Sequence, residues 1–272
     1  MKDKVVIITG ASSGIGRALA ETFGKAGAKI VITGRNEVNL QETSRQLTAQ
    51  GIDNLPVTAD VSIEEDNRKM VEATLERYGR INVLINNAGI TMRALFEDAD
   101  LAVIRKVMDT NFYGTVYATK YCLPHLLQTK GSVVGISSIA GFRGLPARAG
   151  YSASKFALNG FLEVLRTEML HRGVHVLTAS PGFTTSNIRN AALTKDGSVQ
   201  GESPRDEQNM MSAEQCAGHI LQAVRKRRKV LVLTTQGKLT VFLNKWFPGW
   251  MDTVVYNVMA KEKDSPFGKK LS

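Results

Sequence analysis

A glycine-rich loop between a strand and a helix is the feature that most restricts how this chain can fold. The β-branched run within residues 4–9 indicates a buried strand, and the loop TGASSGIG at 9–16 leads into a helix predicted to about residue 26. Glycines let the backbone turn tightly there and approach a pyrophosphate, to which the helix N-terminus offers free N–H groups. The loop residues predicted to bind a dinucleotide are Gly10, Ser12, Ser13, Gly14, Ile15 and Gly16.

Segments typical of strands and helices alternate along the rest of the chain. Repeated βαβ units imply a parallel sheet with helices on both faces. We therefore expect an α/β fold, a single-domain, Rossmann-type, doubly wound parallel sheet. Predicted strands lie near 29–33, 55–59, 82–86, 132–137, 175–180 and 229–234, and predicted helices near 36–50, 63–78, 101–127, 151–171 and 212–226.

The alternation also suggests how the chain is organised. We expect residues 1–235 to form the dinucleotide-binding and catalytic domain, and residues 236–272 to be a C-terminal extension packed on the same domain. Residues 186–211 break the alternation, because they are rich in small and polar residues and long for a connection. Beside a site at the carboxyl ends of the strands, this segment is a candidate lid. The alternative is an ordinary surface excursion.

Composition narrows the class of protein. With 272 residues, 43% hydrophobic and 22% charged, the chain is typical of a globular protein. It has no apolar run of the roughly 18–20 residues that span a bilayer, and its first residues lack the features of a signal peptide. Only Cys122 and Cys216 are present, which suits a reducing compartment, so we expect a cytoplasmic protein. The four histidines show no metal-ligand spacing, and no metal is predicted.

The positive charge is concentrated toward the C-terminus. The net charge is +10, and residues 225–272 contain eleven Lys/Arg against three Asp/Glu. The default interpretation is a solvated basic tail, and the alternative is attraction to an acidic surface. No base-reading motif is present, so nucleic acid is not an expected partner. Among these charges lie Trp246, Phe247 and Trp250. We expect a helical flap over the substrate pocket or a subunit interface, and peripheral lipid contact is the less favoured alternative.

Three residues in the second half of the chain carry the predicted chemistry. Tyr151 and Lys155 are four apart, so on a helix they share one face. An ammonium beside a phenol lowers the phenol pKa, which lets Tyr151 exchange a proton with a carbonyl or an alcohol. Ser138 can hold the same oxygen, and its neighbour Ser137 is the alternative. This set predicts hydride transfer to or from a carbonyl carbon, with the hydride carried by a nicotinamide.

The end of the second predicted strand indicates which nicotinamide cofactor is used. An NAD enzyme usually places an acidic residue there to bind the ribose hydroxyls. The run Ile32–Asn36 contains no acid and places Arg35 where a 2′-phosphate would lie. A guanidinium grips phosphate in bidentate fashion, so NADP(H) is favoured over NAD. The alternative is an Arg35 that merely faces solvent.

The order and spacing of these motifs resemble the short-chain dehydrogenase/reductase family over nearly the whole chain. The glycines follow the spacing G-x-x-x-G-x-G, NNAG lies at 86–89, and Ser138 precedes Tyr151 by thirteen residues. The late features NAALTKDGS and FPGW resemble a narrower branch of microsomal-type enzymes, akin to 11β-hydroxysteroid dehydrogenase and the retinal-type reductases. Animal members of that branch usually carry an N-terminal membrane anchor, and we expect none here.

The resemblance assigns further residues to the site. It implies that Asn111 positions a water behind Lys155, and that Tyr151 and Lys155 also contact the cofactor, with Lys155 on the nicotinamide ribose. The other cofactor residues that it implies are Asp60 and Val61 at the adenine, Asn87, Ala88 and Gly89 beside the cofactor, and Pro181, Gly182, Thr184 and Ser186 toward the carboxamide.

These inferences together predict an NADP(H)-dependent oxidoreductase. It would interconvert a ketone or aldehyde and an alcohol, on a small lipophilic substrate, as a homodimer or homotetramer. One alternative is a reductase of long-chain lipid ketones such as 3-keto sphingoid bases. An alternative from another class is a scaffold that binds NADP with little catalysis. The complete set of Ser138, Tyr151 and Lys155 argues against the scaffold.

Overall fold

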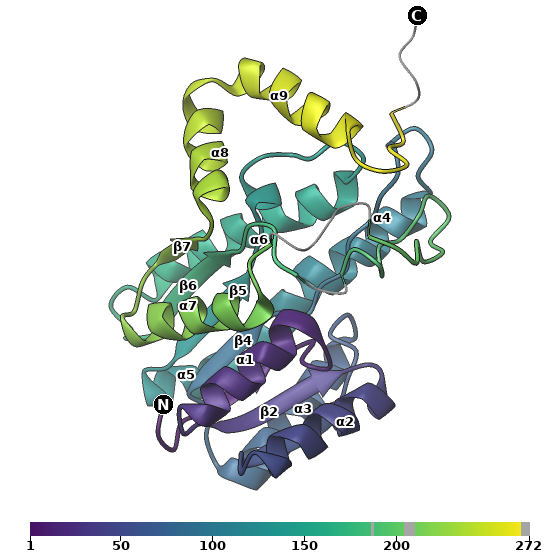
Figure 1. Cartoon of the computed structure of the whole chain (residues 1–272). Coiled ribbons are helices and arrows are strands. Elements are labelled where there is room, and N and C mark those ends of the chain that lie inside the picture. Colours follow the sequence, from purple (N-terminus) through teal and green to yellow (C-terminus); the bar gives the residue numbers. More distant parts are fainter. Residues whose placement is uncertain (186–187, 204–209, 268–272) are drawn as a thin grey trace, which may run out of the picture.

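Seven parallel strands form one central sheet in the computed structural model, which describes residues 1–185, 188–203 and 210–267 (Figure 1). The strand order is β3-β2-β1-β4-β5-β6-β7, so the winding reverses between β1 and β4. This confirms the predicted doubly wound α/β fold in a single domain. The strands are β1 (Val5–Ile8), β2 (Lys29–Gly34), β3 (Asn54–Thr58), β4 (Val83–Asn86), β5 (Ser132–Ile136), β6 (His175–Ser180) and β7 (Val230–Val232).

Helices cover both faces of the sheet (Figure 1). Side chains alternate between the faces along each strand, so Val6 and Ile8 pack on one side and Val5 and Ile7 on the other. The first face is covered by α1 (Gly14–Lys25), α2 (Glu37–Ala49) and α7 (Ala213–Arg225). The second face is covered by α3 (Glu64–Tyr78), α5 (Gly114–Thr129) and α6 (Ala149–Glu168). Because both faces are buried, the strands read as continuous apolar runs.

The helices expected near 101–127 are α4 (Leu101–Met108) and α5, joined by a π-helical turn η1 (Asp109–Tyr113). One segment differs from the predicted pattern. The expected last strand is shortened to β7, because Thr234 (φ 63°) turns the chain out of the sheet. The Thr234 hydroxyl then accepts a hydrogen bond from the N–H of Gly237 at 3.0 Å, which caps α8 (Thr235–Trp246).

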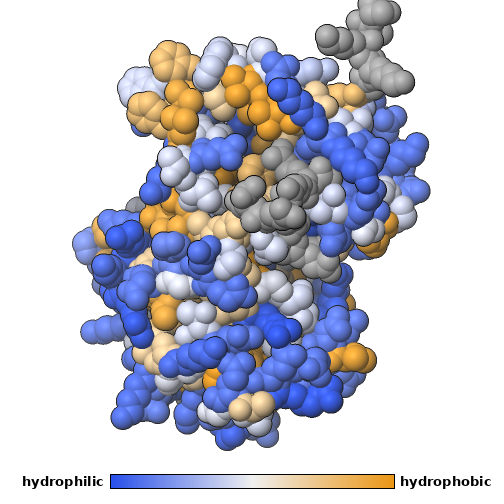
Figure 2. All heavy atoms as spheres, viewed as in Figure 1, coloured by the Kyte–Doolittle hydropathy of each residue, from blue (hydrophilic) through white to orange (hydrophobic). Residues whose placement is uncertain are grey.

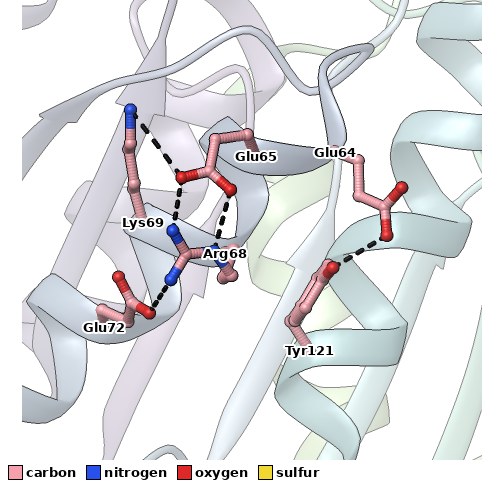
Figure 3. Close-up of polar contacts among 6 residues, drawn as sticks. All are labelled: Glu64, Glu65, Arg68, Lys69, Glu72 and Tyr121. Carbon is pink, nitrogen blue, oxygen red and sulfur yellow. Dashed lines mark hydrogen bonds and ion pairs between the residues drawn. The ribbon is translucent and has the colours of Figure 1, made fainter.

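Figure 3 shows charged side chains that pair with one another on the outer face of α3. Arg68 forms ion pairs with Glu65 and Glu72, one turn away on either side. The Tyr121 hydroxyl on α5 donates a hydrogen bond to Glu64 at 2.7 Å, which ties α5 to α3. Exposed pairs of this kind contribute little stability, and they leave this face close to neutral.

The last two helices stand apart from the sheet, at the end where the strands have their carboxyl termini (Figure 1). They are α8 and α9 (Pro248–Ala260). Met251, Val255 and Met259 lie on one stripe of α9 and are buried in a separate hydrophobic cluster, against Leu145. Hydrophobic side chains also show on the outside of these helices in Figure 2. Within the described residues, no helix combines the length and apolar character that a membrane span requires.

Candidate active site

The loops at the carboxyl ends of the strands enclose a cavity of about 740 Å³. Its walls come from the loops after β1, β2, β4, β5 and β6, together with α6, α8 and α9. In open α/β sheets, ligands bind in this position, where the winding reverses. The cavity brings most of the predicted site residues together.

The glycine loop is packed tightly against the loop after β4. Gly10 has a left-handed backbone (φ 63°), and a Cβ placed there would lie 2.7 Å from the Cα of Ala88. At Gly16, a Cβ would lie 2.2 Å from the carbonyl oxygen of Gly10. No larger residue fits either position, because the contacts are with backbone atoms. The glycine loop, the start of α1 and the loop after β4 therefore form one rigid wall of the cavity.

Thr9 and Asn87 fasten this wall. The buried Thr9 hydroxyl accepts hydrogen bonds from the N–H groups of Asn87 and Ala88, both at 3.0 Å. The Asn87 amide donates to the carbonyl oxygens of Thr9 and Gly10, at 2.9 and 3.0 Å. The sequence analysis missed Thr9 as a site residue. Its position as a polar residue ending an apolar strand is the signal that could have identified it.

The N-terminus of α1 opens onto the cavity. Ser13 occupies the N-cap position, but its side chain makes no capping hydrogen bond, so it leaves first-turn N–H groups for a ligand. This arrangement fits the pyrophosphate of a dinucleotide. The predicted cofactor residues that line the cavity are Gly10, Ser12, Ser13, Gly14, Ile15, Gly16, Arg35, Val61, Asn87, Ala88, Gly89, Tyr151, Lys155, Pro181, Gly182 and Thr184.

One predicted cofactor residue of the described chain, Asp60, is not part of this lining. Asp60 follows β3, and its carboxylate accepts hydrogen bonds from the N–H and hydroxyl of Ser62, at 2.9 and 2.7 Å. A second oxygen of Asp60 lies 3.7 Å from a guanidinium nitrogen of Arg35. Asp60 therefore shapes the turn and faces Arg35 rather than the cavity. Ser186 lies outside the described residues.

Ser138 and Tyr151 meet at the centre of the cavity. Ser138 follows β5, and its hydroxyl accepts a hydrogen bond from the N–H of Ala140 at 3.1 Å. Ser138 and Tyr151 both line the cavity, and Ser138 acts to lower the pKa of the Tyr151 hydroxyl. Its neighbour Ser137 donates to the amide oxygen of Asn159 at 2.6 Å, which uses that hydroxyl in packing against α6. The geometry therefore favours Ser138 over Ser137 as the polarising group.

The pKa of Tyr151 differs from the sequence expectation. Burial raises the pKa of the Tyr151 hydroxyl, while the hydrogen bond with Ser138 and the charges of Arg148 and Arg189 act to lower it. Lys155 is not among the groups that shift it, although its Nζ lies 5.7 Å from the Tyr151 ring centre. Desolvation of the phenol therefore outweighs the neighbouring charges.

Lys155 lies deep beside Tyr151, one turn further along α6. Its Nζ donates a hydrogen bond to the carbonyl oxygen of Ile136 at 2.8 Å. Burial lowers the pKa of Lys155 to about 8, since desolvation disfavours the cation and no carboxylate in the described part of the chain pairs with it. The ammonium is therefore poised to lose its proton just above neutral pH.

Asn111 lies in the π-helical turn η1, with no exposed surface. Its side chain pairs with the backbone of Ile90, accepting from the N–H at 2.8 Å and donating to the carbonyl at 2.9 Å. It also donates to the Ser154 hydroxyl at 2.9 Å. A Cβ at Gly89 would lie 3.2 Å from the Asn111 oxygen and 3.6 Å from the Lys155 Nζ. Asn111 thus holds the loop after β4 close to Lys155, and π-turns often occur at such functional positions.

The far end of the cavity is apolar and is closed by α9. Met251, Val255 and Met259 line it, and each is less than 10% exposed. Trp246, Phe247 and Trp250 point outward and are about 60% exposed. Helical periodicity accounts for Trp250, because it lies off the buried stripe of α9 that residues 251, 255 and 259 share.

A buried ion cluster joins the end of α9 to the catalytic helix. Glu262 accepts a hydrogen bond from Arg148 at 2.9 Å, and Arg93 lies 3.6 Å from the same oxygen. The Glu262 side chain is only 3% exposed. Arg148 directly precedes α6, three residues before Tyr151. The sequence analysis did not find this cluster, because Arg93 and Glu262 are 169 residues apart in the chain.

The described part of the candidate lid is docked beside the cavity. Leu193 is buried, and its N–H donates to the carbonyl of Thr91 at 2.9 Å. Thr184 pairs with Met211 across the segment, and Arg189 donates to the Thr184 carbonyl at 3.0 Å. Residues 188–192 contribute to the cavity wall, as expected for a segment next to the substrate. Residues 204–209 of this predicted segment lie outside the described part of the chain.

Sequence comparisons find relatives that span most of the chain. A family model described as short chain dehydrogenase matches residues 4–197. "Dehydrogenase/reductase SDR family member 7B" from Mus musculus is 37% identical over 271 residues, covering 97% of this chain and 84% of that protein. "11-beta-hydroxysteroid dehydrogenase-like 4A" from Arabidopsis thaliana is 37% identical over 223 residues, covering 81% of this chain and 73% of that protein.

Solved structures share the fold at lower identity. A short chain dehydrogenase/reductase from Burkholderia phymatum, solved in complex with NAD, has a TM-score of 0.82 and 24% identity, covering 92% of this chain and 95% of that chain. An alcohol dehydrogenase from Thermococcus sibiricus, complexed with 5-hydroxy-NADP, has a TM-score of 0.75 and 22% identity, covering 85% and 96%. At this level of identity, the likeness concerns the fold alone.

Proposed function

The chain belongs to the short chain dehydrogenase family of oxidoreductases, and we propose that it interconverts a ketone or aldehyde and an alcohol with NADP(H), on a lipophilic substrate. One observation carries this proposal. A single cavity joins the glycine loop, the Ser138–Tyr151–Lys155 set and an apolar wall. Cofactor, proton donor and substrate would therefore meet in one enclosed space.

The cofactor would lie along the first half of the sheet. The open N-terminus of α1 and the glycine loop would bind the pyrophosphate, and Arg35 would bind the 2′-phosphate of NADP. Lys155 would contact the nicotinamide ribose. When bound, the nicotinamide supplies or accepts the hydride. One structural neighbour was solved with NAD and the other with an NADP derivative, which supports a nicotinamide cofactor without separating NAD from NADP.

The protein's own residues would transfer the proton to the substrate oxygen. In reduction, the Ser138 hydroxyl donates a hydrogen bond to the substrate carbonyl, and the Tyr151 hydroxyl gives its proton to the same oxygen. Because burial raises the pKa of Tyr151, the phenol keeps its proton at neutral pH and is ready to act as an acid. The charges of Arg148 and Arg189 favour the phenolate that forms, and Asn111 holds the adjoining loop in place.

The apolar wall supports a lipophilic substrate. Met251, Val255 and Met259 face the far end of the cavity, and burial of apolar substrate surface there contributes about 25 cal/mol per Å². The Arabidopsis thaliana relative is named for its likeness to 11-beta-hydroxysteroid dehydrogenase, which supports a lipophilic class of substrate. A long-chain lipid ketone, such as a 3-keto sphingoid base, suits the same wall and remains the alternative.

A spectrophotometric substrate screen tests the proposal. Oxidation of NADPH and of NADH is followed with steroids, retinoids, sphingoid ketones and small aldehydes. We expect turnover with NADPH on a lipophilic carbonyl, and weaker turnover with small aldehydes. Tight NADPH binding without turnover on any member of the panel would favour the scaffold alternative instead.

The assembly and the location are also proposals. We propose a homodimer or homotetramer, supported by exposed hydrophobic side chains on one side of the molecule, such as Tyr113, Phe156 and Val164, each 43–59% exposed. Light scattering after size-exclusion chromatography tests the assembly. A cytoplasmic location is tested by fractionating cells that express the protein at its native level.

A further inference from the structure

A second hollow lies at the opposite edge of the sheet, where the strands have their amino ends. Its volume is about 380 Å³, within the range of small-ligand sites. The lining residues come from just before β1, β4 and β5, and from the segment that joins α7 to β7. In Figure 1 the N-terminus marks this edge, away from α8 and α9. The hollow is therefore separate from the candidate active site.

The lining of this hollow carries positive charge only. Five of its residues are cations, namely Lys2, Lys4, Lys130, Arg225 and Arg227, and none is an aspartate or glutamate. All five are exposed. Throughout the described ranges, none of the five has an acidic partner within ion-pair distance, unlike Arg68 on α3 in Figure 3. Their mutual repulsion is lowered further when an anion binds among them.

The backbone presents two of these cations in an unusual conformation. Lys130 and Arg227 both have φ of 47°, in the left-handed region that non-glycine residues seldom adopt. The Arg227 guanidinium donates to the Gly173 carbonyl at 2.7 Å and to the Lys130 carbonyl at 3.4 Å. These bonds fix the guanidinium at the rim and leave its remaining N–H groups for a ligand. Lys130 caps the end of α5 and Arg227 lies just beyond the cap of α7, so this conformation turns the chain at the two helix ends that border the hollow.

From this geometry we propose that the hollow binds a polyphosphate group. Clustered phosphate oxyanions match several cations at once, and Arg and Lys are the residues that bind them. A soluble polyphosphorylated metabolite and a phosphorylated lipid headgroup share this chemistry. The proposal gives a partner to Arg225 and Arg227, which belong to the run of basic residues from Arg225 to Lys229. It does not depend on the proposed enzyme activity.

Calorimetric titration with inorganic tripolyphosphate tests the site. The full chain is first saturated with NADPH, so that the glycine loop and Arg35 are occupied. We expect one saturable site, weakened at least about tenfold in the double variant Lys4→Gln/Arg225→Gln because two charge-assisted contacts are lost. The matched control Arg105→Gln/Lys120→Gln removes the same charge from exposed positions outside the hollow, and should bind within about twofold of wild type.

A second arm separates the two sources of phosphate. Vesicles of phosphatidylcholine with or without phosphatidylinositol bisphosphate are sedimented with the same three proteins. Phosphoinositide-dependent binding with the same variant pattern assigns a lipid headgroup, and tripolyphosphate binding without it assigns a soluble ligand. The proposal is overturned if neither probe binds saturably, or if both double variants lose binding equally while their circular dichroism stays native.

Discussion

A guanidinium nitrogen of Arg35 lies 3.7 Å from a carboxylate oxygen of Asp60, although the two side chains come from the ends of different strands. The Arg35 side chain is 52% exposed and the Asp60 side chain 26%. The pair is too long for a strong hydrogen bond and is largely solvated, so it holds Arg35 only loosely. A 2′-phosphate could therefore replace Asp60 as the partner of Arg35 at little cost.

Arg35→Ala should weaken NADPH binding far more than NADH binding. A charge-assisted phosphate contact contributes on the order of 1.5–3 kcal/mol, which is about 10–150-fold in affinity. Fluorescence titration with the two cofactors measures the difference. Asp60→Asn serves as the control, since it frees Arg35 and should leave NADPH binding equal or tighter. Equal losses for both cofactors would show that Arg35 does not contact the 2′-phosphate.

The rate of NADPH capture should fall as pH rises through about 8. Burial lowers the pKa of Lys155 to about 8, so the free enzyme carries this cation below that pH and loses it above. The value of kcat/KM for NADPH reports ionisations of the free enzyme, and it should be level on the acidic side and decline on the basic side. A profile that stays level to about pH 10, the ordinary lysine range, would contradict the assigned role.

Met251→Ala should raise KM for bulky lipophilic substrates by about tenfold. Met251 is 3% exposed and faces the cavity, and a buried methionine side chain contributes about 1.5–3 kcal/mol of apolar burial. Its neighbour Trp250 is 57% exposed, so Trp250→Ala should change KM by less than about twofold. Steady-state kinetics on both variants measure the two changes in KM. A larger effect from Trp250→Ala would mean that the outer face of α9 binds the substrate.

Glu262→Gln should destabilise the fold by about 3–5 kcal/mol, because it leaves the buried Arg148 and Arg93 without their shared counter-charge. Urea unfolding measures the change. Asp252→Asn is the control, since Asp252 pairs with Arg143 but its own side chain is 73% exposed, and the cost there should be within about 1 kcal/mol. Similar losses in the two variants would show that the Glu262 cluster has no special role in holding the C-terminal segment.

The part of the site that depends on local chain order was predictable from the sequence. The glycine loop directly follows β1, Ser138 lies two residues after β5, and Tyr151 and Lys155 share one face of α6 through their four-residue spacing. Parallel strands bring their carboxyl ends to one edge of the sheet. The choice of Ser138 over Ser137 depended on spacing alone, and the structure supplies a reason in the Ser137–Asn159 hydrogen bond.

Features that depend on tertiary contact were not predictable in this way. Glu262 approaches Arg93 only after α9 has folded back across the cavity, and no periodicity signals that return. The outward orientation of Trp246 follows from which stripe of the last helices meets the core, and their aromatic composition does not reveal it. Burial, rather than sequence neighbours, decides the pKa of Tyr151.

The most direct test of the account is the turnover of Tyr151→Phe measured beside wild type, with NADPH and the best carbonyl substrate from the screen. The variant keeps the ring in the cavity and removes the transferable proton. We predict a fall in kcat of at least about 10²-fold, with the NADPH dissociation constant changed by less than about twofold. Near-full turnover by a correctly folded Tyr151→Phe protein would contradict the central claim that this phenol is the acid of the reaction.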